Sequence, residues 1–385
     1  MFFLKLLLRN AFRHKLRTSL TILSITIAIL AFGLLRTFIS AWYAGVKASS
    51  ASRLVTRNSI SLIFPLPLSY KEKIRQIDGV KHVSWGTWFG GIYIDEKNFF
   101  ANFAVDPRTY LDLYPEFILA PEQEEAFLRD RKSFVAGRKL ASRFKWRIGD
   151  TVVLRGTIFP GNWEFVLRGI YRGRDETIDE TQFVFHWNYL NETLKKNAPS
   201  RADQVGWYMV GVTNPNVATH VALAIDGTFK NSLAETLTET EKAFQLSFIS
   251  MSEAILIAIE LVSIVIVIII IAVAANTMAM TARERIGEYA VFKTLGFRGW
   301  RIAWMIVGES LVIALTGGIL GMAATFPIAA AFGRILSAFF PIFNVPEEIF
   351  LMDLAAVLVV GLLAAVVPTW RATRIRIADG LRRIG

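Results

Sequence analysis

The sequence predicts a membrane protein with four transmembrane helices and a large α+β extracytoplasmic domain between the first and second helices, joined to them by a helical stalk. The chain has 385 residues, of which 53% are hydrophobic, and its mean hydropathy is +0.42. Soluble chains of this size are usually less apolar. Four runs reach the length of about 20 residues that a helix needs to cross a bilayer. Residues 41–250, between the first two runs, mix helical and strand patterns.

The four spans are defined by where the apolar runs begin and end. The third run ends at Pro327, and an outer loop over 327–348 leads to the fourth. Arg36, Glu260 and Glu309 lie inside the runs, where a charged side chain is costly and therefore indicates a partner or a function. The predicted spans are residues 18–40, 251–282, 301–326 and 349–370.

Lysine and arginine gather in three flanking segments: a basic amphipathic helix over 1–17, the segment 283–300, and a tail over 371–385. Short cytoplasmic segments of membrane proteins are enriched in these residues. We therefore expect both termini in the cytoplasm and residues 41–250 outside it. Residues 37–252 hold 26 basic and 23 acidic side chains, so most of the net charge of +11 lies in and beside the spans. This distribution argues against nucleic acid as a partner and indicates contact with membrane lipids.

The outer segment alternates short helices and strands. A serine cap and a glycine stop predict a helix over 69–80, and an amphipathic pattern predicts another over 137–146. A third helix is expected over 216–229, opened by Asn216 and stopped by Gly227. Aromatic and β-branched residues predict strands, the second and third of them as a hairpin, over 82–94, 151–156, 163–172 and 204–212.

The stretch before the second span predicts the stalk. Residues 235–260 contain neither proline nor glycine, so one continuous helix is expected to run from the outer domain into the membrane. A helix of about 40 residues would be about 60 Å long. Such a rod could transmit displacement across the membrane, or it could simply anchor the domain, and the residues favour neither interpretation.

No motif for catalysis or metal binding is present. The sequence lacks a P-loop, H-E-x-x-H and G-x-S-x-G. Without cysteine it can form neither a disulfide nor a Cys-ligated metal site. Acidic residues over 175–180 could hold a cation, although a solvated loop is the simpler interpretation. We therefore expect no enzyme activity and no cofactor in this chain. The histidines are scattered and more often structural than ligating: His14, His82, His186 and His220.

The segment "RERIGEYAVFKTLGF", residues 283–297, predicts an amphipathic helix between two spans. On a helix, Tyr289, Ala290, Ile286 and Lys293 share a face, while Arg285 and Glu288 point elsewhere, and Gly296 is a natural stop. Such a helix could lie flat on the inner leaflet. It could equally dock against a cytoplasmic partner.

Four segments together resemble MacB/FtsX-type ABC transporter permeases of the type VII superfamily. "NTMAMTARERIGEYAVFKTLGFRGWRI", residues 276–302, is similar to the family's link between its second and third spans, which carries the coupling helix. "LLLRNAFRHKLRTSLTILSITIAI" resembles its first span, "FVAGRKLASRFKWRIGDTVVLRG" its outer domain, and "VVPTWRATRIRIADGLRR" its C-terminal tail. Unlike MacB, this sequence has no fused nucleotide-binding domain. The coupling motif keeps Glu284, Ile286, Gly287, Lys293, Leu295 and Gly296.

The resemblance implies a permease subunit in a bacterial inner membrane. Two permease copies, in a homo- or heterodimer, would pair above two cytoplasmic ABC ATPase subunits, and these would bind ATP and Mg. ATP hydrolysis would move the outer domains to export or extract a hydrophobic substrate, a lipid or a lipoprotein, with a possible periplasmic adaptor. The alternative is an FtsX-like signalling platform that regulates a cell-wall hydrolase. On this basis Glu288, Tyr289 and Lys293 are expected at the ATPase contact.

Two further expectations concern helix packing and intramembrane charge. Gly317 and Gly321 form a small-xxx-small pair that allows close helix approach. Arg36 lies about 27 Å from the start of its span and Glu260 about 30 Å from the far end of the next span, at 1.5 Å per residue. Opposite charges at one depth predict an ion pair, unless each side chain extends separately to the headgroups.

Overall fold

The computed structural model describes residues 11–336, 340 and 342–374. The chain divides into two compact units. The first, here called the helix unit, is drawn from Met1–Ala41, Glu253–Ile335 and Phe343–Gly385. The second, the sheet domain, comprises Trp42–Ser252 and Leu336–Ile342. Most of the basic helix expected over 1–17 and most of the tail expected over 371–385 lie outside the described residues.

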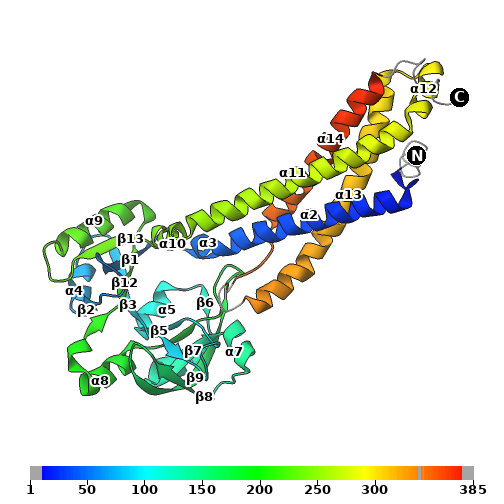
Figure 1. Ribbon diagram of the computed structural model, residues 1–385. Coiled ribbons are helices and arrows are strands. Elements are labelled where there is room, and N and C mark those ends of the chain that lie inside the picture. Colours follow the sequence, from blue (N-terminus) through cyan, green and yellow to red (C-terminus); the bar gives the residue numbers. More distant parts are fainter. Residues whose placement is uncertain (1–10, 337–339, 341, 375–385) are drawn as a thin grey trace. The chain divides into compact units, whose positions relative to one another are not determined.

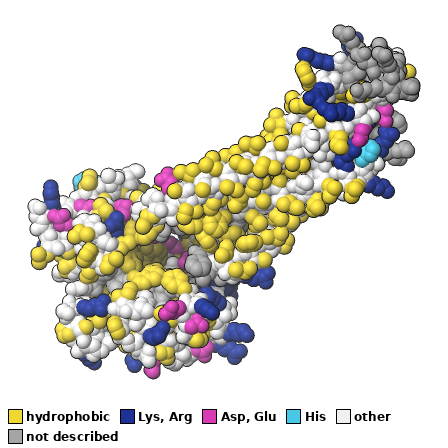
Figure 2. All heavy atoms as spheres, viewed as in Figure 1, with side chains coloured by type: hydrophobic (Ala, Val, Ile, Leu, Met, Phe, Trp, Pro, Cys, Tyr) yellow, Lys and Arg dark blue, Asp and Glu magenta, His cyan; other side chains and the backbone are white. Residues whose placement is uncertain are grey.

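Four helices of the described residues are long and apolar enough to cross a membrane. A helix suits this environment because it satisfies all of its backbone hydrogen bonds internally. Hydrophobic side chains cover the visible outside of these helices, and basic side chains gather at the end where α12 lies (Figure 2). The helices are α2 (Lys15–Trp42), α11 (Glu253–Glu284), α13 (Gly299–Ile335) and α14 (Glu347–Thr373), with the short α12 (Ile286–Thr294) between α11 and α13.

Glycines allow α13 to pack closely on its neighbours. A Cβ atom on Gly317 would lie 2.9 Å from the carbonyl oxygen of Ile22, and one on Gly321 would lie 2.8 Å from that of Thr26. Both glycines therefore face α2 within the same chain, and the predicted close approach is confirmed. On another side of α13, a Cβ on Gly318 would overlap Val357 of α14.

The third span continues beyond the proline at which it was expected to end. Helix α13 runs through Pro327 to Ile335, so only the later part of the predicted outer loop is non-helical among the described residues. The expectation treated proline as a stop signal. Within membrane spans, however, neighbouring groups can satisfy the backbone that proline leaves unpaired, so a helix can continue through it.

The sheet domain contains a mixed sheet of 11 strands among the described residues (Figure 1). Its order is β13-β1-β12-β3-β5-β10-β7-β9-β8-β4, with β6 beside β9, and β11 pairs with β2 separately. The pairs β5–β10 and β7–β9 are parallel, whereas the predicted hairpin β8–β9 is antiparallel. The strands are β1 (Arg53–Asn58), β2 (Leu66–Pro67), β3 (Val80–Trp88), β4 (Gly91–Ile92), β5 (Asn102–Val105), β6 (Phe117–Ile118), β7 (Ser133–Gly137), β8 (Thr151–Gly156), β9 (Gly161–Gly173), β10 (Phe183–His186), β11 (Gln204–Val205), β12 (Trp207–Val212) and β13 (Thr236–Thr240).

Short helices complete the sheet domain, and aromatic side chains fill its core. Phe134, Phe165, Phe183 and Phe185 are fully buried against one another, which supports a structural role for the aromatic residues. The helices are α3 (Ala44–Ala48), α4 (Tyr70–Arg75), α5 (Pro107–Leu113), α6 (Pro121–Arg129), α7 (Arg138–Phe144), α8 (Trp187–Asn197), α9 (Ala218–Thr228) and α10 (Glu241–Ser250).

Two predictions for the end of this domain are wrong. The continuous helix expected over 235–260 is instead the strand β13, the helix α10 and, after a turn, α11. Thr238 pairs with Thr56 of β1 at 2.9 Å between hydroxyls, and such cross-strand pairing outweighs the local helical pattern. Helix α9 begins at Ala218, after a short helical turn capped by Asn214, and it passes through Gly227 to Thr228.

Candidate functional site

Helix α12 is the short amphipathic helix that the sequence predicts, but it is shorter than the segment 283–300. Helix α11 continues to Glu284, α12 occupies Ile286–Thr294, and α13 begins at Gly299. The chain turns after α12 at Gly296, whose φ of +87° favours glycine. Tyr289 and Ala290 are buried in the core of the helix unit, so one face of α12 belongs to the fold of this chain.

A buried ion pair ties the start of α12 to α13. The Nη1 atom of Arg285 lies 2.9 Å from Oε2 of Glu309, and their side chains are only 6% and 5% exposed. Glu309 is ten residues into α13, about 15 Å along its axis. The sequence analysis placed Arg285 off the face that Tyr289 and Ala290 share, and it did not predict that Arg285 is buried. Removing one member of such a pair leaves an uncompensated buried charge, which typically costs about 3–5 kcal/mol.

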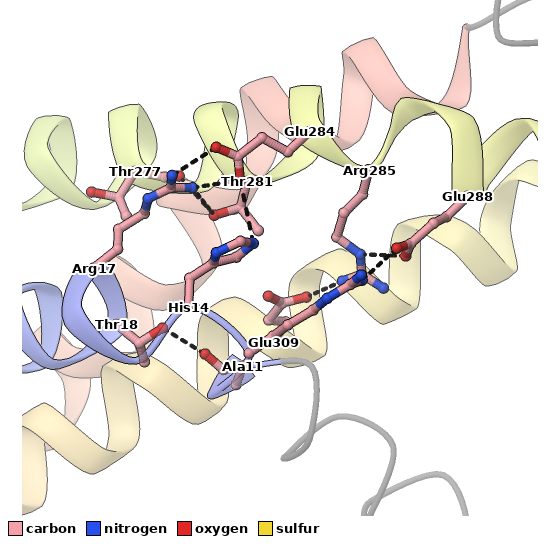
Figure 3. Close-up of polar contacts among 11 residues, drawn as sticks. Ala11, His14, Arg17, Thr18, Thr277, Thr281, Glu284, Arg285, Glu288 and Glu309 are labelled. Atoms are coloured by element: carbon pink, nitrogen blue, oxygen red, sulfur yellow. Dashed lines mark hydrogen bonds and ion pairs between the residues drawn. The ribbon is translucent and has the colours of Figure 1, made fainter. Parts of the chain in front are cut away.

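The described N-terminal residues form a second set of contacts with the same region (Figure 3). Arg17 donates two hydrogen bonds to Glu284, at 2.8 and 2.7 Å, and Nε2 of His14 lies 3.5 Å from the same carboxylate. Arg13 pairs with Glu288, which also accepts from Nε of Arg285 at 2.9 Å. The start of α2, the end of α11 and α12 are thereby joined by charge-assisted bonds.

The local environment shifts the pKa values of two side chains on α12. Burial raises the pKa of Tyr289 to about 12, which keeps its hydroxyl neutral. Burial also acts to raise the pKa of Glu288, but hydrogen bonds from Arg13 and Arg285 outweigh it and bring this pKa below its ordinary value. Glu288 is therefore ionised and can hold both arginines near neutral pH.

The surface that α12 leaves for a partner differs from the predicted one. Tyr289 is 2% exposed, and Nζ of Lys293 donates to the carbonyl oxygen of Thr373 at 2.8 Å, so both take part in contacts within the chain. The expectation that these two residues form a partner contact is wrong for Tyr289, because a buried ring cannot reach a second protein. The exposed apolar side chains here are Val291, Leu295 and Phe297, which are 40%, 69% and 37% exposed.

The sequence contains a signal for these ion pairs that our prediction missed. Arg13 and Arg17 are four residues apart, as are their partners Glu288 and Glu284. In the helices expected over 1–17 and 283–300, residues four apart would share one face, so the matched spacing of opposite charges indicates pairing. In the structure Arg13 precedes α2, and Glu284 and Glu288 lie on different helices. The Arg285–Glu309 pair has no such regular spacing.

At the other end of the helix unit, α2 and α11 form the ion pair predicted from depth. Nη1 of Arg36 lies 3.0 Å from Oε1 of Glu260, and the side chains are 18% and 53% exposed. The guanidinium also lies over the ring of Phe32, 5.5 Å from its centre. This pair lies within one chain and, unlike Arg285–Glu309, remains open on the Glu260 side.

The predicted acidic cluster is involved in contacts within the chain. Asp179 accepts from the backbone and side chain of Thr181, both at 2.7 Å, and Glu180 pairs with Arg138 at 3.1 Å. The described residues contain no group of three or more His, Cys, Asp or Glu side chains arranged to hold a metal. Nε2 of His186 donates a hydrogen bond to the carbonyl oxygen of Phe127 at 2.7 Å, so this histidine has a structural role.

Comparison with known proteins identifies the C-terminal part of the chain. Residues 260–377 match the family model "FtsX-like permease C-terminal", a range that includes α12, Glu309, Gly317 and Gly321. No curated protein sequence matches the chain.

Three solved structures are similar to about half of the chain. The periplasmic region of MacB from Actinobacillus actinomycetemcomitans is 11% identical, with a TM-score of 0.38, and covers 53% of this chain and 95% of its own. The extracellular domain of the noncanonic ABC-type transporter YknZ from Gram-positive bacteria is 10% identical, with a TM-score of 0.36. The match covers 49% of this chain and 100% of that domain. A domain of a putative permease from Porphyromonas gingivalis is 14% identical, with a TM-score of 0.33. The match covers 49% of this chain and 90% of that domain.

Proposed function

We propose that this chain, a multi-pass membrane permease of the MacB/FtsX kind, is the membrane subunit of an ABC transporter. A separate cytoplasmic ATPase would bind ATP and Mg, and the permease would convert ATP hydrolysis into movement of its sheet domain. The observation that carries this proposal is the fastening of α12 to its neighbours. The buried Arg285–Glu309 pair ties its start to α13, and Glu288 pairs with Arg13, just before α2. Beside them, Arg17 of α2 pairs with Glu284 at the end of α11. A helix bound on several sides can pass a force to all of them.

The proposed docking surface is the exposed edge of α12 and the turn that follows it. Leu295 and Phe297 project apolar side chains from a segment rich in arginine. Isolated exposed apolar side chains are common, but two neighbouring ones on a turn beside an amphipathic helix suit insertion into a groove of a partner. Basic flanks on this side of the spans support a cytoplasmic position for the turn and for both termini.

The ion pairs explain how a push on α12 would travel. Arg285 connects α12 to Glu309, three turns inside α13, and Glu288 connects it to Arg13. Because α13 in turn packs on α2 through Gly317 and Gly321, α12 and both helices would move together. Helices α2 and α11 continue along the chain into the sheet domain, so their displacement would reach it covalently.

The proposed cargo is a hydrophobic substrate, a lipid or a lipoprotein, exported or extracted outside the cytoplasm. Pairing with a second permease copy is supported by α11, which is strongly hydrophobic but has few side chains buried within the described chain. Its uncovered apolar side would be shared between lipid and the second copy.

Co-purification tests the docking surface. The tagged chain is isolated from its host membranes, and the ABC ATPase that accompanies it is quantified by mass spectrometry and by ATP turnover. We expect Leu295→Asp with Phe297→Asp to lower the amount of co-purified ATPase and its ATP turnover by about tenfold or more each. Each change places a charge in an apolar contact. The matched control makes the same kind of change at exposed apolar positions of the sheet domain, Ile63→Asp with Leu233→Asp.

The outcome that overturns the proposal is equal recovery of the ATPase with the docking variant and with the control. Melting of each purified variant in detergent separates a lost contact from a lost fold. Tyr289→Ala is unsuitable for this test, because removing a buried ring opens a cavity in the helix unit.

A further inference from the structure

A groove on the sheet domain combines an apolar floor with a basic rim. Its volume is about 850 Å³, within the range of about 300–1,000 Å³ that is usual for small-molecule sites. It is lined by three neighbouring parts of the domain: the stretch from β6 to α6, helix α7 with the residues that follow it, and strand β9. None of these residues belongs to the α12 site, so the groove is a separate feature of the molecule.

The floor of the groove is formed by hydrophobic side chains. Trp146 and Ala141 are 7% and 3% exposed, and Leu119 and Ile170 are partly buried beside them. The polar edge of the Trp146 ring is already used, because its Nε1 atom donates to the hydroxyl of Tyr93 at 3.3 Å. The floor therefore offers surface for an apolar ligand and few polar atoms with which to bind a peptide backbone.

The rim carries four cationic side chains, and none of the described residues that line the groove is acidic. Arg138 pairs with the buried Glu180, so its charge is partly neutralised. The described structure gives no ion pair for the other three side chains, those of Lys145, Arg147 and Arg172, and all three are exposed. Asp150 accepts from the backbone amide of Arg147 at 2.8 Å rather than from its side chain.

Lys145 occupies a backbone position that favours another residue. It ends α7 in the left-handed conformation, with φ of 57°, where glycine is the usual choice. A lysine at this position adds a positive charge at the edge of the groove despite the local backbone preference.

We propose that this groove binds an anionic amphiphile: a lipid whose acyl chain lies on the Trp146 floor and whose phosphate contacts the basic rim. Charge complementarity and the apolar floor together favour this class. A free phosphate would gain nothing from the floor, and an acidic peptide would find few partners there for its backbone. The proposal rests on the proposed function in one respect, since it identifies the lipid class of cargo that the sheet domain would hold.

The test measures lipid binding to the purified full-length chain in a neutral detergent by native mass spectrometry. The probes are two monoacyl phospholipids with the same acyl chain, one with an anionic phosphoglycerol headgroup and one with a zwitterionic phosphocholine headgroup. The groove variant removes three rim charges, and the control variant removes three exposed charges elsewhere in the same domain. The groove variant is Lys145→Gln with Arg147→Gln and Arg172→Gln, and the control is Lys97→Gln with Arg108→Gln and Lys230→Gln.

We expect the groove variant to weaken binding of the phosphoglycerol lipid by about tenfold or more, with little effect on the phosphocholine lipid, and the control variant to bind like the parent chain. Ile118 is a further apolar residue that lines the groove. The variant Ile118→Asn should weaken both lipids equally, and it is tolerable because Ile118 is 51% exposed. Thermal melting confirms that each variant is folded.

Three results would overturn the proposal. Equal losses in the groove and control variants would indicate general electrostatic attraction. Displacement of the lipid by inorganic phosphate alone at low concentration would indicate an anion site without a role for the floor. Binding of an acidic peptide in place of the lipid would indicate a protein partner. Because no ATPase is present in this assay, its failure leaves the α12 docking proposal intact, and a failure of docking leaves the groove proposal intact.

Discussion

The two ends of the helix unit are each held by an ion pair, and the two pairs differ in burial. Arg285 and Glu309 are 6% and 5% exposed and belong to a network with Glu288 and Arg13, whereas Arg36 and Glu260 are 18% and 53% exposed. A buried pair is expensive to break, because the remaining charge has no water to solvate it. A half-exposed pair near the end of its spans can reach headgroups and water, so it contributes less. The α12 end is therefore held firmly in one geometry, whereas the pair at the opposite end can separate at little cost.

The largest expected effect tests the rigid contact between the two ends. Replacing Gly317 and Gly321 together with leucine places side chains 2.9 and 2.8 Å from backbone oxygens of α2, which cannot move aside as a side chain could. Overpacking costs about 1–3 kcal/mol per site, so we expect the double change to lower the free energy of unfolding by about 2–6 kcal/mol. Thermal unfolding of the purified chain in detergent measures this loss of stability. An unchanged melting temperature would show that α2 and α13 are not in rigid contact.

The second prediction compares the two ion pairs directly. We expect Glu309→Ala to lower the free energy of unfolding by about 3–5 kcal/mol, because Arg285 is left charged and buried. The matched change at the other end, Glu260→Ala, should cost about 0–1 kcal/mol. Denaturant titration of both variants under one condition gives the difference, and similar losses would remove the contrast between the ends.

A third prediction separates stability from coupling at the buried pair. Arg285→Met with Glu309→Leu removes both charges and keeps apolar volume, so it should recover most of the stability lost in Glu309→Ala. It should not recover ATP turnover of the complex with its ATPase, if the ion pair fixes the direction of α12 relative to α13. Full recovery of turnover would show that the pair serves the fold alone.

The contrast between the pairs also explains what the sequence could predict. Counting residues along two apolar runs brought Arg36 and Glu260 to one depth, because each run defines a helix and its length. The same counting could not predict the Arg285–Glu309 ion pair. That contact depends on the orientation of α12, which buries Tyr289 and Ala290. Local pattern failed again at Thr236–Thr240, where pairing with β1, a segment far away in the sequence, selects a strand. The order of the sheet, with β10 parallel to β5, has no local signal at all.

The smallest expected effect concerns the half-exposed pair. Arg36→Glu places two carboxylates together beside α11, and Glu260→Arg places two guanidinium groups there. We expect each single change to cost about 1 kcal/mol, since the attraction of a screened pair is replaced by repulsion of similar size. The double swap restores opposite charges at the same depth and should recover at least half of the loss, although Arg36 also gives up its position over the ring of Phe32. A double-mutant cycle on the free energy of unfolding measures the coupling, with Arg36→Lys as a control that keeps the charge. If the double swap costs as much as the two single changes together, the two side chains do not interact, and the contact between α2 and α11 at this end depends on apolar packing alone.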